Sequence, residues 1–396
     1  MHVPAVSRIP TPRTSALLVW MAMLAVPAQG QIVVDPGAAR GLRPTVLVAP
    51  NGVPLVNIQT PGRGGVSRNI YRQLDVERRG AIFNNSRGDV QTRLGGWVQG
   101  NPWLARGPAR IILNEVRSND PSLLLGPMEV AGARAQLVIA NPSGIACDGC
   151  SFINASRASL VTGLPVMEGE SLAGWQVARG TVRFGADGMD SRDADATEVL
   201  ARAVEVHGAV LARRLDVVTG VNHITLGDDG PQATASPGQP GGDAPAYALD
   251  VARLGGMYAQ SIRLVGTEAG VGVRNAGDIG ATAGEVSVTV AGRLENAGRI
   301  RAAGDATLRA DATVDNAGTV SAVGRLAMHA GDAIQGAGLV AAGTAVDLQA
   351  AQLDLSGAQV LSGDIHLQAS RGDLVVAGAT VEASGALDIR AAGTLR

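Results

Sequence analysis

The two cysteines of the chain are the side chains best suited to covalent chemistry. Cys147 and Cys150 are separated by two residues, a spacing found in redox pairs, in halves of zinc sites and in short disulfide rings. A cysteine-based zinc site lacks its other ligands, since no histidine lies nearer than His207. A redox pair would open a helix, whereas residues 151–162 have the pattern of strand and turn. In an oxidising compartment we predict a disulfide between Cys147 and Cys150, with free thiols and a redox pair as alternatives.

Other polar groups have simple structural interpretations. The cluster of Asp187, Asp190, Asp193 and Asp195 lacks the glycine and the terminal glutamate of a calcium loop, so a solvated loop is preferred. The Arg-Gly-Asp triplets at 87–89 and 371–373 fit turns better than integrin-binding sites. The sequence contains no nucleophile elbow and no assignable pair of catalytic carboxylates. We therefore predict that the chain is not an enzyme and holds no metal or cofactor.

Two Asn-Pro motifs carry the functional prediction. The first consists of Asn101, Pro102, Trp103 and Leu104, and the second of Asn141, Pro142, Ser143, Gly144 and Ile145. Such residues form turns in any protein, so a purely structural role is the simple alternative. The second motif lies between an apolar run at 137–139 and a β-like run at 159–162. It is therefore expected to connect two strands.

The first thirty residues have the organisation of a secretory signal. Arg8 and Arg13 precede an apolar run at 16–26. The small residues Ala28 and Gly30 then occupy the two positions that a signal peptidase reads. The run is too short for the roughly 20 residues that a membrane-spanning helix needs. We predict that residues 1–30 are removed and that the mature chain begins near Gln31 without an integral membrane segment. The signal also provides the oxidising compartment that a disulfide requires.

The composition favours a narrow β structure. The formal net charge of −2 provides no broad attraction for nucleic acid or an anionic membrane. Aromatic residues make up only 3% of the chain, although 46% of its residues are hydrophobic. The core must therefore consist of small aliphatic side chains in many thin layers.

The C-terminal part repeats with a period of about twenty residues. Asn-Ala-Gly begins at Asn275, Asn296 and Asn316, and each copy is followed by a short apolar strand. A second strand in each repeat alternates apolar and polar residues, as in Val286 to Val290. This pattern is typical of a β-solenoid, in which each coil buries its apolar face against the next coil. The asparagine column is expected either to form a ladder of side-chain hydrogen bonds or to occupy left-handed turns.

These patterns divide the chain into four segments. After the signal, residues 31–226 show short β-like runs, and the weak helical periodicity of this segment is strongest at 194–206. Residues 227–246 are rich in Gly, Pro and Asp and are predicted to form a flexible loop. Residues 247–396 contain the repeats. We interpret residues 227–246 as a loop that projects from one continuous stack of coils, in preference to a linker between independent domains.

The Asn-Pro motifs also carry a resemblance to a known family. Residues 141–154, with Asn-Pro, Gly-Ile, Cys-x-x-Cys and Phe-Ile-Asn in that order, resemble the secretion domain of two-partner-secretion exoproteins, the filamentous-haemagglutinin family. The first motif occupies the place of the family's upstream Asn-Pro-Asn-Leu motif, and Trp103 and Ser143 stand where the family usually has asparagine. The resemblance implies an all-β fold, a right-handed parallel β-helix with extra-helical strands capping its N-terminal coil.

The resemblance also implies a function. Residues 31–226 are expected to direct export through a dedicated outer-membrane β-barrel transporter with periplasmic domains, using the two Asn-Pro motifs. The protein would then be a secreted or surface-bound adhesin of a Gram-negative bacterium, with a host-cell or bacterial receptor and no nucleic-acid partner. The alternative is the delivery stalk of a contact-dependent toxin or a haemolysin. A β-helix polysaccharide lyase or hydrolase is a third hypothesis, for which the sequence shows no catalytic cluster.

Overall fold

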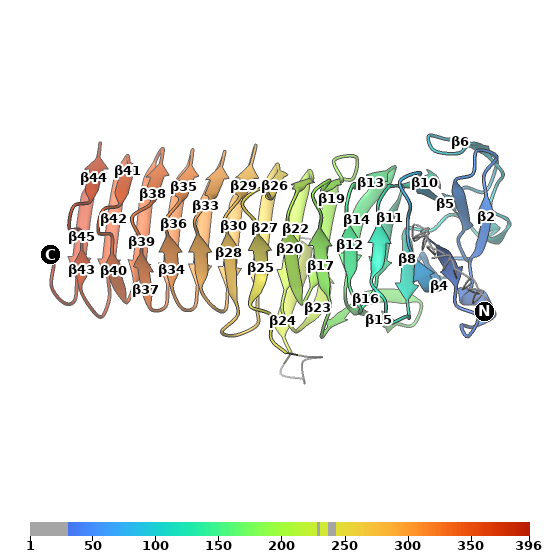
Figure 1. Ribbon diagram of the computed structural model, residues 1–396, viewed down its shortest axis with the longest axis horizontal. Coiled ribbons are helices and arrows are strands. Elements are labelled where there is room, and N and C mark those ends of the chain that lie inside the picture. The colour runs from blue at the N-terminus through green and yellow to red at the C-terminus, as the bar shows by residue number, and fades with distance from the viewer. Residues whose placement is uncertain (1–30, 228–229, 237–242) are drawn as a thin grey trace, which may run out of the picture.

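The computed structural model describes residues 31–227, 230–236 and 243–396. These residues form a rod of stacked β-strands (Figure 1) with two short 3-10 helices, η1 (Arg40–Leu42) and η2 (Pro102–Leu104). The predicted signal at 1–30 lies outside the described residues. The described chain is a right-handed parallel β-helix, which confirms the predicted fold class.

Three long sheets form the rod. Sheets A and B run its whole length and sheet C begins at residue 122, and from there each coil contributes one strand to each sheet. Sheet A follows the order β1 (Ile32–Val34), β4 (Val66–Leu74), β8 (Ile111–Val116), β11 (Ala135–Ala140), β14 (Ala155–Val161), β19 (Ala196–Ala201), β22 (Arg214–Thr219), β27 (Ser261–Gly266), β30 (Val286–Val290), β33 (Ala306–Ala310), β36 (Arg325–Ala330), β39 (Ala345–Ala350), β42 (Asp364–Ala369) and β45 (Leu387–Ala391). Sheet B follows the order β2 (Thr45–Val48), β3 (Pro54–Asn57), β5 (Ala81–Asn85), β10 (Pro127–Gly132), β13 (Cys150–Ile153), β18 (Met189–Asp190), β21 (Ala209–Leu211), β26 (Gly256–Ala259), β29 (Asp278–Ala281), β32 (Arg299–Ala302), β35 (Thr319–Ala322), β38 (Leu339–Ala342), β41 (Gln359–Ser362) and β44 (Thr380–Ala383). Sheet C contains β9 (Ser122–Leu124), β12 (Ile145–Cys147), β17 (Thr181–Phe184), β20 (Ala203–Val206), β25 (Tyr247–Val251), β28 (Gly272–Asn275), β31 (Leu294–Asn296), β34 (Val314–Asn316), β37 (Ala333–Gln335), β40 (Gln352–Asp354) and β43 (Leu374–Val375).

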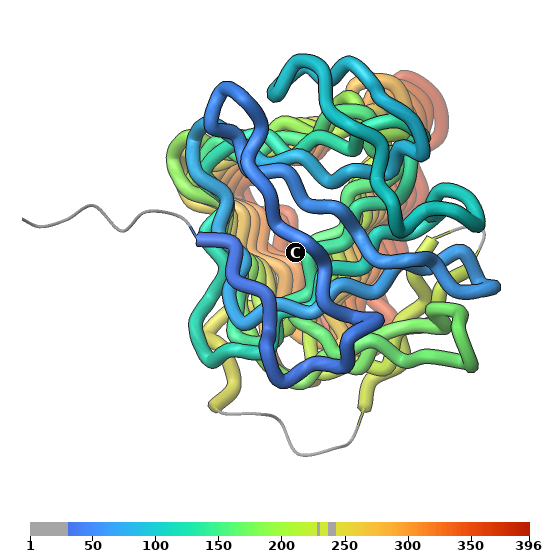
Figure 2. Tube along the Cα trace, turned by 90° about the vertical axis from the view of Figure 1, so that its right-hand side faces the viewer, coloured from blue at the N-terminus to red at the C-terminus, as the bar shows by residue number. Residues whose placement is uncertain are grey.

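The repeat period equals one coil. Val286 of β30 lies beside Ala306 of β33, and Ala306 lies beside Leu326 of β36, so equivalent residues twenty apart pair in parallel. The apolar positions of each strand point into a single core that continues from coil to coil. Figure 2, a view along the rod, shows the coils superposed. The sequence pattern revealed two strands per coil, and the structure adds a third, the short strand that ends at the asparagine column.

The asparagine column forms the predicted ladder. Nδ2 of Asn275 donates to Oδ1 of Asn296, and Nδ2 of Asn296 donates to Oδ1 of Asn316, both at 2.8 Å. All three side chains are buried. Among the described residues the only non-glycine with a positive φ is Asn154, at 58°, so the left-handed alternative is wrong for this column. The ladder pairs polar groups that would otherwise be buried without partners.

Extra-helical strands cap the N-terminal coil, as predicted. β1 runs antiparallel to β4 at the end of sheet A, and β2 runs antiparallel to β3 at the end of sheet B. A second hairpin, β6 (Val90–Thr92) with β7 (Gly96–Val98), lies at the same end of the rod in Figure 1. We call residues 31–110 the N-terminal cap.

A four-stranded antiparallel sheet covers the outer face of sheet A, and this element was not predicted. It contains β15 (Leu164–Glu168), β16 (Ser171–Val177), β23 (Asn222–Gly227) and β24 (Gly230–Ala235). Trp175 and Ile224 of this sheet pack on Val138 and Val161 in a second core cluster. Outward-facing residues of sheet A are therefore buried here, whereas the outer strand positions of the repeats are mostly polar and accessible.

Two local predictions need correction. The segment 227–246, predicted to be a flexible loop, contains β24, which pairs along its length with β23; residues 228–229 and 237–242 lie outside the described part. Beyond this segment β27 pairs with β22, so the solenoid is continuous across it. The helical periodicity at 194–206 is also misleading, because β19 and β20 occupy it. All six residues of β19 are buried, since both faces of sheet A are covered at this point.

Candidate functional site

The first Asn-Pro motif forms the short helix η2, which Asn101 caps. Oδ1 of Asn101 accepts a hydrogen bond from the Trp103 backbone N–H at 3.0 Å. Its Nδ2 donates to the carbonyl oxygens of Ile58 and Asn84, both at 2.9 Å. The side chain is buried, and Leu104 is fully buried in the main core. Asn101 therefore links the turn to β5 and to the residue after β3.

The second motif repeats this arrangement around Asn141. Oδ1 of Asn141 accepts from the Ser143 backbone N–H at 2.9 Å. Its Nδ2 donates to the carbonyl oxygen of Asp120 and to Oγ of Ser122, both at 3.0 Å. Ile145 starts β12 and is buried in the main core. In both motifs a buried asparagine holds its own turn and the neighbouring coil, and an apolar residue enters the core.

The exposed parts of the motifs are few. Asn101 and Asn141 are almost completely buried, so their amides cannot contact a partner while the domain is folded. Pro102 and Trp103 are exposed, Trp103 to 45%, and Nε1 of Trp103 donates to Oγ1 of Thr45 at 3.3 Å. The two asparagines therefore hold the turns within the folded domain, whereas Pro102 and Trp103 are accessible.

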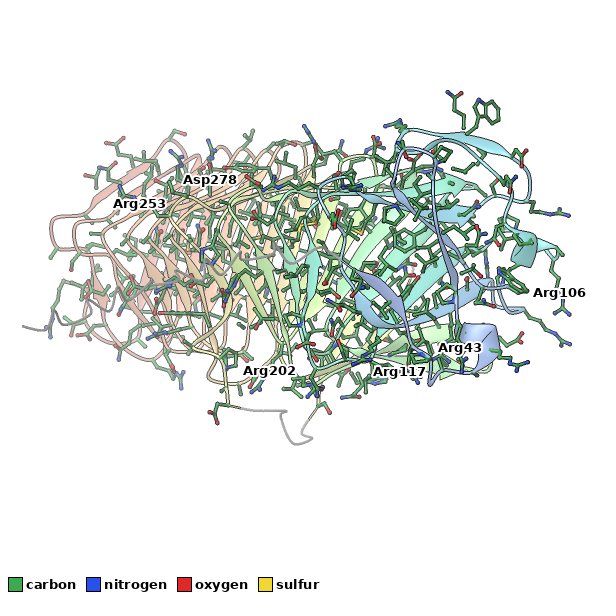
Figure 3. All side chains as sticks on the ribbon, turned by 45° about the vertical axis from the view of Figure 1, so that its right-hand side comes forward. Arg43, Arg106, Arg117, Arg202, Arg253 and Asp278 are labelled. Atoms are coloured by element: carbon green, nitrogen blue, oxygen red, sulfur yellow. A yellow bond between two sulfur atoms is a disulfide. The ribbon has the colours of Figure 1, made fainter. Side chains whose placement is uncertain are left out.

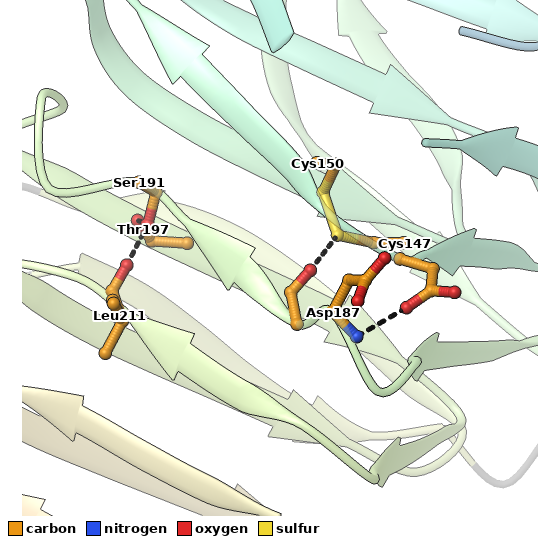
Figure 4. Close-up of a disulfide and its surroundings, with 8 residues drawn as sticks. Cys147, Cys150, Asp187, Ser191, Thr197 and Leu211 are labelled. Carbon is orange, nitrogen blue, oxygen red and sulfur yellow. Dashed lines mark hydrogen bonds between the residues drawn. A yellow bond between two sulfur atoms is a disulfide. The ribbon is translucent and has the colours of Figure 1, made fainter. Parts of the chain in front are cut away.

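The cysteines form a disulfide at a corner of the solenoid (Figure 4). Cys147 ends β12 in sheet C and Cys150 begins β13 in sheet B, with a Cα–Cα distance of 5.4 Å. Both residues are buried. Gly149 between them has φ +85°, a conformation that favours glycine in this tight turn. Oδ1 of Asp148 accepts from the Asp187 N–H at 2.7 Å and so joins this corner to the next coil.

The remaining polar groups from the sequence are engaged within the fold. Each aspartate of the acidic cluster pairs with an arginine: Asp187 with Arg78, Asp190 with Arg192, Asp193 with Arg93, and Asp195 with Arg134 and Arg213. Asp89 and Asp373 of the Arg-Gly-Asp triplets each accept a hydrogen bond from a backbone N–H. Within the described ranges no group of three or more His, Cys, Asp or Glu residues could hold a metal ion.

Sequence reasoning missed a buried charge network on the outer face of sheet A. Glu198 of β19 accepts hydrogen bonds from Nη1 of Arg157 at 2.6 Å and from Oγ of Ser159 at 2.9 Å. Burial raises the pKa of Glu198 above its ordinary value, and the charge of Arg157 opposes this shift. No sequence signal marks this network, because its members come from neighbouring coils.

The raised pKa of Glu198 predicts a pH dependence of stability. The folded chain holds the Glu198 proton more tightly than the unfolded chain does. The contribution of Glu198 to the free energy of unfolding is therefore fully present below the pKa that it has in the unfolded chain. This contribution declines as pH rises through the pKa that Glu198 has in the folded chain. The unfolding midpoint of the parent chain, relative to that of Glu198→Gln, should therefore fall as pH rises above 4.5 in urea titrations. A pH-independent difference would contradict this assignment.

Comparison with known families decides the identity of this region. The model of the TPS secretion domain, where TPS stands for two-partner secretion, matches residues 31–296, and the model of the haemagglutinin repeat matches residues 301–374 and 350–396. The chain belongs to the two-partner-secretion exoproteins. Members of this family are exported across the outer membrane of Gram-negative bacteria to the cell surface or the extracellular space, with an outer-membrane transporter as partner.

Related two-partner-secretion proteins are much longer. A protein named Toxin CdiA from Yersinia pestis is 50% identical over 293 residues, which is 74% of this chain and 9% of the relative. The tRNA nuclease CdiA-2 of Burkholderia pseudomallei (strain 1026b) is 44% identical over 293 residues, again 74% of this chain and 9% of the relative. The chain therefore spans about a tenth of the length of these curated relatives.

A solved structure supports the fold. The crystal structure of the filamentous hemagglutinin secretion domain is 33% identical in sequence, with a TM-score of 0.59 over 85% of this chain and all of that one. The part of this exoprotein matched by the family models is a secretion domain followed by structural repeats. In the described ranges, no helix has the length and apolar character needed to cross a bilayer.

The geometry explains how this exoprotein departs from the usual family motifs. In both motifs the third residue contributes its backbone N–H to the asparagine cap, and its side chain is not needed for that bond. Trp103 and Ser143 can therefore replace asparagine without loss of the turn. Oγ of Ser143 adds a hydrogen bond of its own, to the carbonyl oxygen of Ser118 at 2.9 Å.

Proposed function

We propose that residues 31–226 of this exoprotein are the address that the periplasmic domains of its outer-membrane transporter recognise. The match to the TPS secretion domain carries this proposal. The match extends to residue 296 and covers the cap, both Asn-Pro motifs and the covering sheet. In this proposal the motifs act chiefly by stabilising the folded domain, because Asn101 and Asn141 are buried.

Folding of the repeats outside the cell would make export directional. The repeats cross the transporter in an extended form, and each coil then stacks on the coil before it. Each coil buries several aliphatic side chains, for example Val286, Val288 and Leu294. Each such residue contributes about 1.5–3 kcal/mol when buried, so a completed coil opposes return of the chain.

Deleting residues 31–226 should abolish export of the remaining chain. The protein in the culture medium and on the cell surface would be quantified with an antibody against the repeats. The matched control deletes residues 319–338, a single coil. Because Thr319 and Leu339 occupy equivalent positions in β35 and β38, the stack can close across this deletion and export should persist. Undiminished export without residues 31–226 would contradict the proposal.

Outside the cell we propose that the rod acts as an adhesin stalk without enzymatic activity of its own. The second candidate is the delivery stalk of a contact-dependent toxin, which the similarity to proteins named Toxin CdiA favours. Mixed cultures distinguish the two: producer cells would inhibit related neighbours on contact only if the chain serves toxin delivery. Binding of producer cells to host cells without such inhibition would support the adhesin.

A further inference from the structure

The N-terminal cap contains a groove lined by exposed apolar side chains. Its walls come from β2 and β3 on one side and from β7 and η2 on the other. Leu47, Val48, Trp97 and Trp103 line it and are 44%, 69%, 68% and 45% exposed. Aromatics make up only 3% of the whole chain, so two exposed tryptophans in one groove are unusual for this protein. Exposed apolar surface of this kind marks an interaction site.

The strand β2, which lines this groove, also has an unpaired edge among the described residues. Within the described ranges β2 is the last strand of sheet B and pairs only with β3. The Ala49 N–H donates a hydrogen bond to the Val53 carbonyl oxygen. In an antiparallel pair every second residue hydrogen-bonds to the partner strand, so Leu47 and Thr45 direct their backbone N–H and C=O groups toward β3. The N–H and C=O groups of Val46 and Val48 therefore point away from β3. Such an edge is a template for another extended chain.

The cap is basic although the chain as a whole is not. Residues 31–110 contain 11 arginines and 4 acidic residues, a formal charge of +7, whereas residues 111–396 contain 20 arginines and 31 acidic residues, a charge of −11. Figure 3 shows Arg43 and Arg106 at the cap end of the rod. Seven cap arginines form no salt bridge with the described residues: Arg40, Arg43, Arg63, Arg72, Arg87, Arg106 and Arg110. A partner for this surface should be acidic.

We propose that the edge of β2 and the adjoining groove bind an extended, acidic segment of the transporter's periplasmic domains, which adds a strand to sheet B. This inference rests on the proposed export function and specifies the surface that the transporter contacts. The strand edge supplies backbone hydrogen bonds, the tryptophans take apolar side chains, and the arginines attract the acidic residues. An anionic lipid would use the arginines but would leave the edge of β2 unpaired.

A cross-linking experiment locates the surface in cells. A photoreactive amino acid at Val48 or Trp97 should cross-link the exported chain to its transporter. Val323 on the rod is 70% exposed, nearly the same as Val48, and is the matched control that should not cross-link. Equal cross-linking to the transporter from positions 48 and 323 would overturn the proposal.

Two substitutions test the binding mode with the intact chain and the detergent-solubilised transporter. Val48→Pro removes an outward N–H at an edge position that tolerates proline, and Trp97→Ala removes an aromatic contact. Each should raise Kd roughly tenfold, with unchanged circular dichroism and protease resistance. Wild-type affinity and export in both variants would overturn the inference. The inference would also be overturned if the two variants lost binding to anionic phosphatidylglycerol vesicles while their affinity for the transporter stayed unchanged. The proposed function would survive either result if deletion of residues 31–226 still abolished export.

Discussion

Gly298→Ala should strongly destabilise the repeat stack. A Cβ atom at Gly298 would lie 2.1 Å from the carbonyl oxygen of Gly277 in the preceding coil. The carbonyl oxygen belongs to the backbone of a packed coil and the Cβ is fixed to the backbone of residue 298, so neither atom can move aside as the end of a flexible side chain would. Overpacking of this kind costs about 1–3 kcal/mol, and we expect the upper end of that range or more. Urea or thermal unfolding followed by circular dichroism would measure the loss.

Gly280→Ala is the matched control for this prediction. It lies in β29 of the same stack, and its Cβ would approach nothing closer than Cδ1 of Tyr258, at 3.4 Å, an ordinary contact. We expect the stability of this variant to change by less than about 0.5 kcal/mol. If both variants lost similar stability, the close approach of the coils at residue 298 would not be the cause of the destabilisation in Gly298→Ala.

Asn141→Ala should destabilise the secretion domain and reduce export. The substitution removes the acceptor for the Ser143 N–H and the donor to the Asp120 carbonyl and to Ser122, and of these groups Asn141 and Ser122 are buried. A lost hydrogen bond costs about 1 kcal/mol and more where a buried partner is left unpaired, so we expect the loss of three to cost about 3 kcal/mol. Chemical unfolding of the purified chain and the amount of exported protein would be measured together.

Ser143→Asn provides the comparison for Asn141→Ala. It introduces the residue that the family usually has and retains the backbone N–H that caps the turn. Its cost should stay below about 1 kcal/mol, from the lost Ser143 to Ser118 hydrogen bond. If Asn141→Ala proved as mild as Ser143→Asn, the asparagine would have to act through something other than its buried hydrogen bonds.

The parts of the fold that could be predicted are those encoded locally and repeated. Alternation within Val286 to Val290 and the twenty-residue spacing follow from one physical requirement, that each coil bury one face against the next. The third strand of each coil escaped prediction because it is only two to five residues long and shows little alternation, as in Leu294 to Asn296. The asparagine column had two interpretations, and only the positions of neighbouring coils distinguished them.

The candidate site also has parts that the sequence encodes locally and parts that depend on contacts between distant segments. The Asn-Pro motifs are recognisable in the sequence, but their role depends on which acceptors lie within reach of Asn101 and Asn141. The groove beside β2 joins Val48 to Trp97, almost fifty residues later, and no periodic pattern relates them. The helical periodicity at 194–206 failed because β19 is buried on both faces, which removes the polar alternation that marks a strand.

The sequence by itself determined the coil length and the β-helical class, because these depend on spacing that every repeat restates, and its Asn-Pro and cysteine motifs indicated the family of this exoprotein. The tertiary structure alone decided that a second sheet covers sheet A, that Glu198 is buried beside Arg157, and that β2 has an unpaired edge among the described residues. These features arise where segments distant in sequence meet. Contact between such segments depends on how the whole chain packs, which no local pattern encodes.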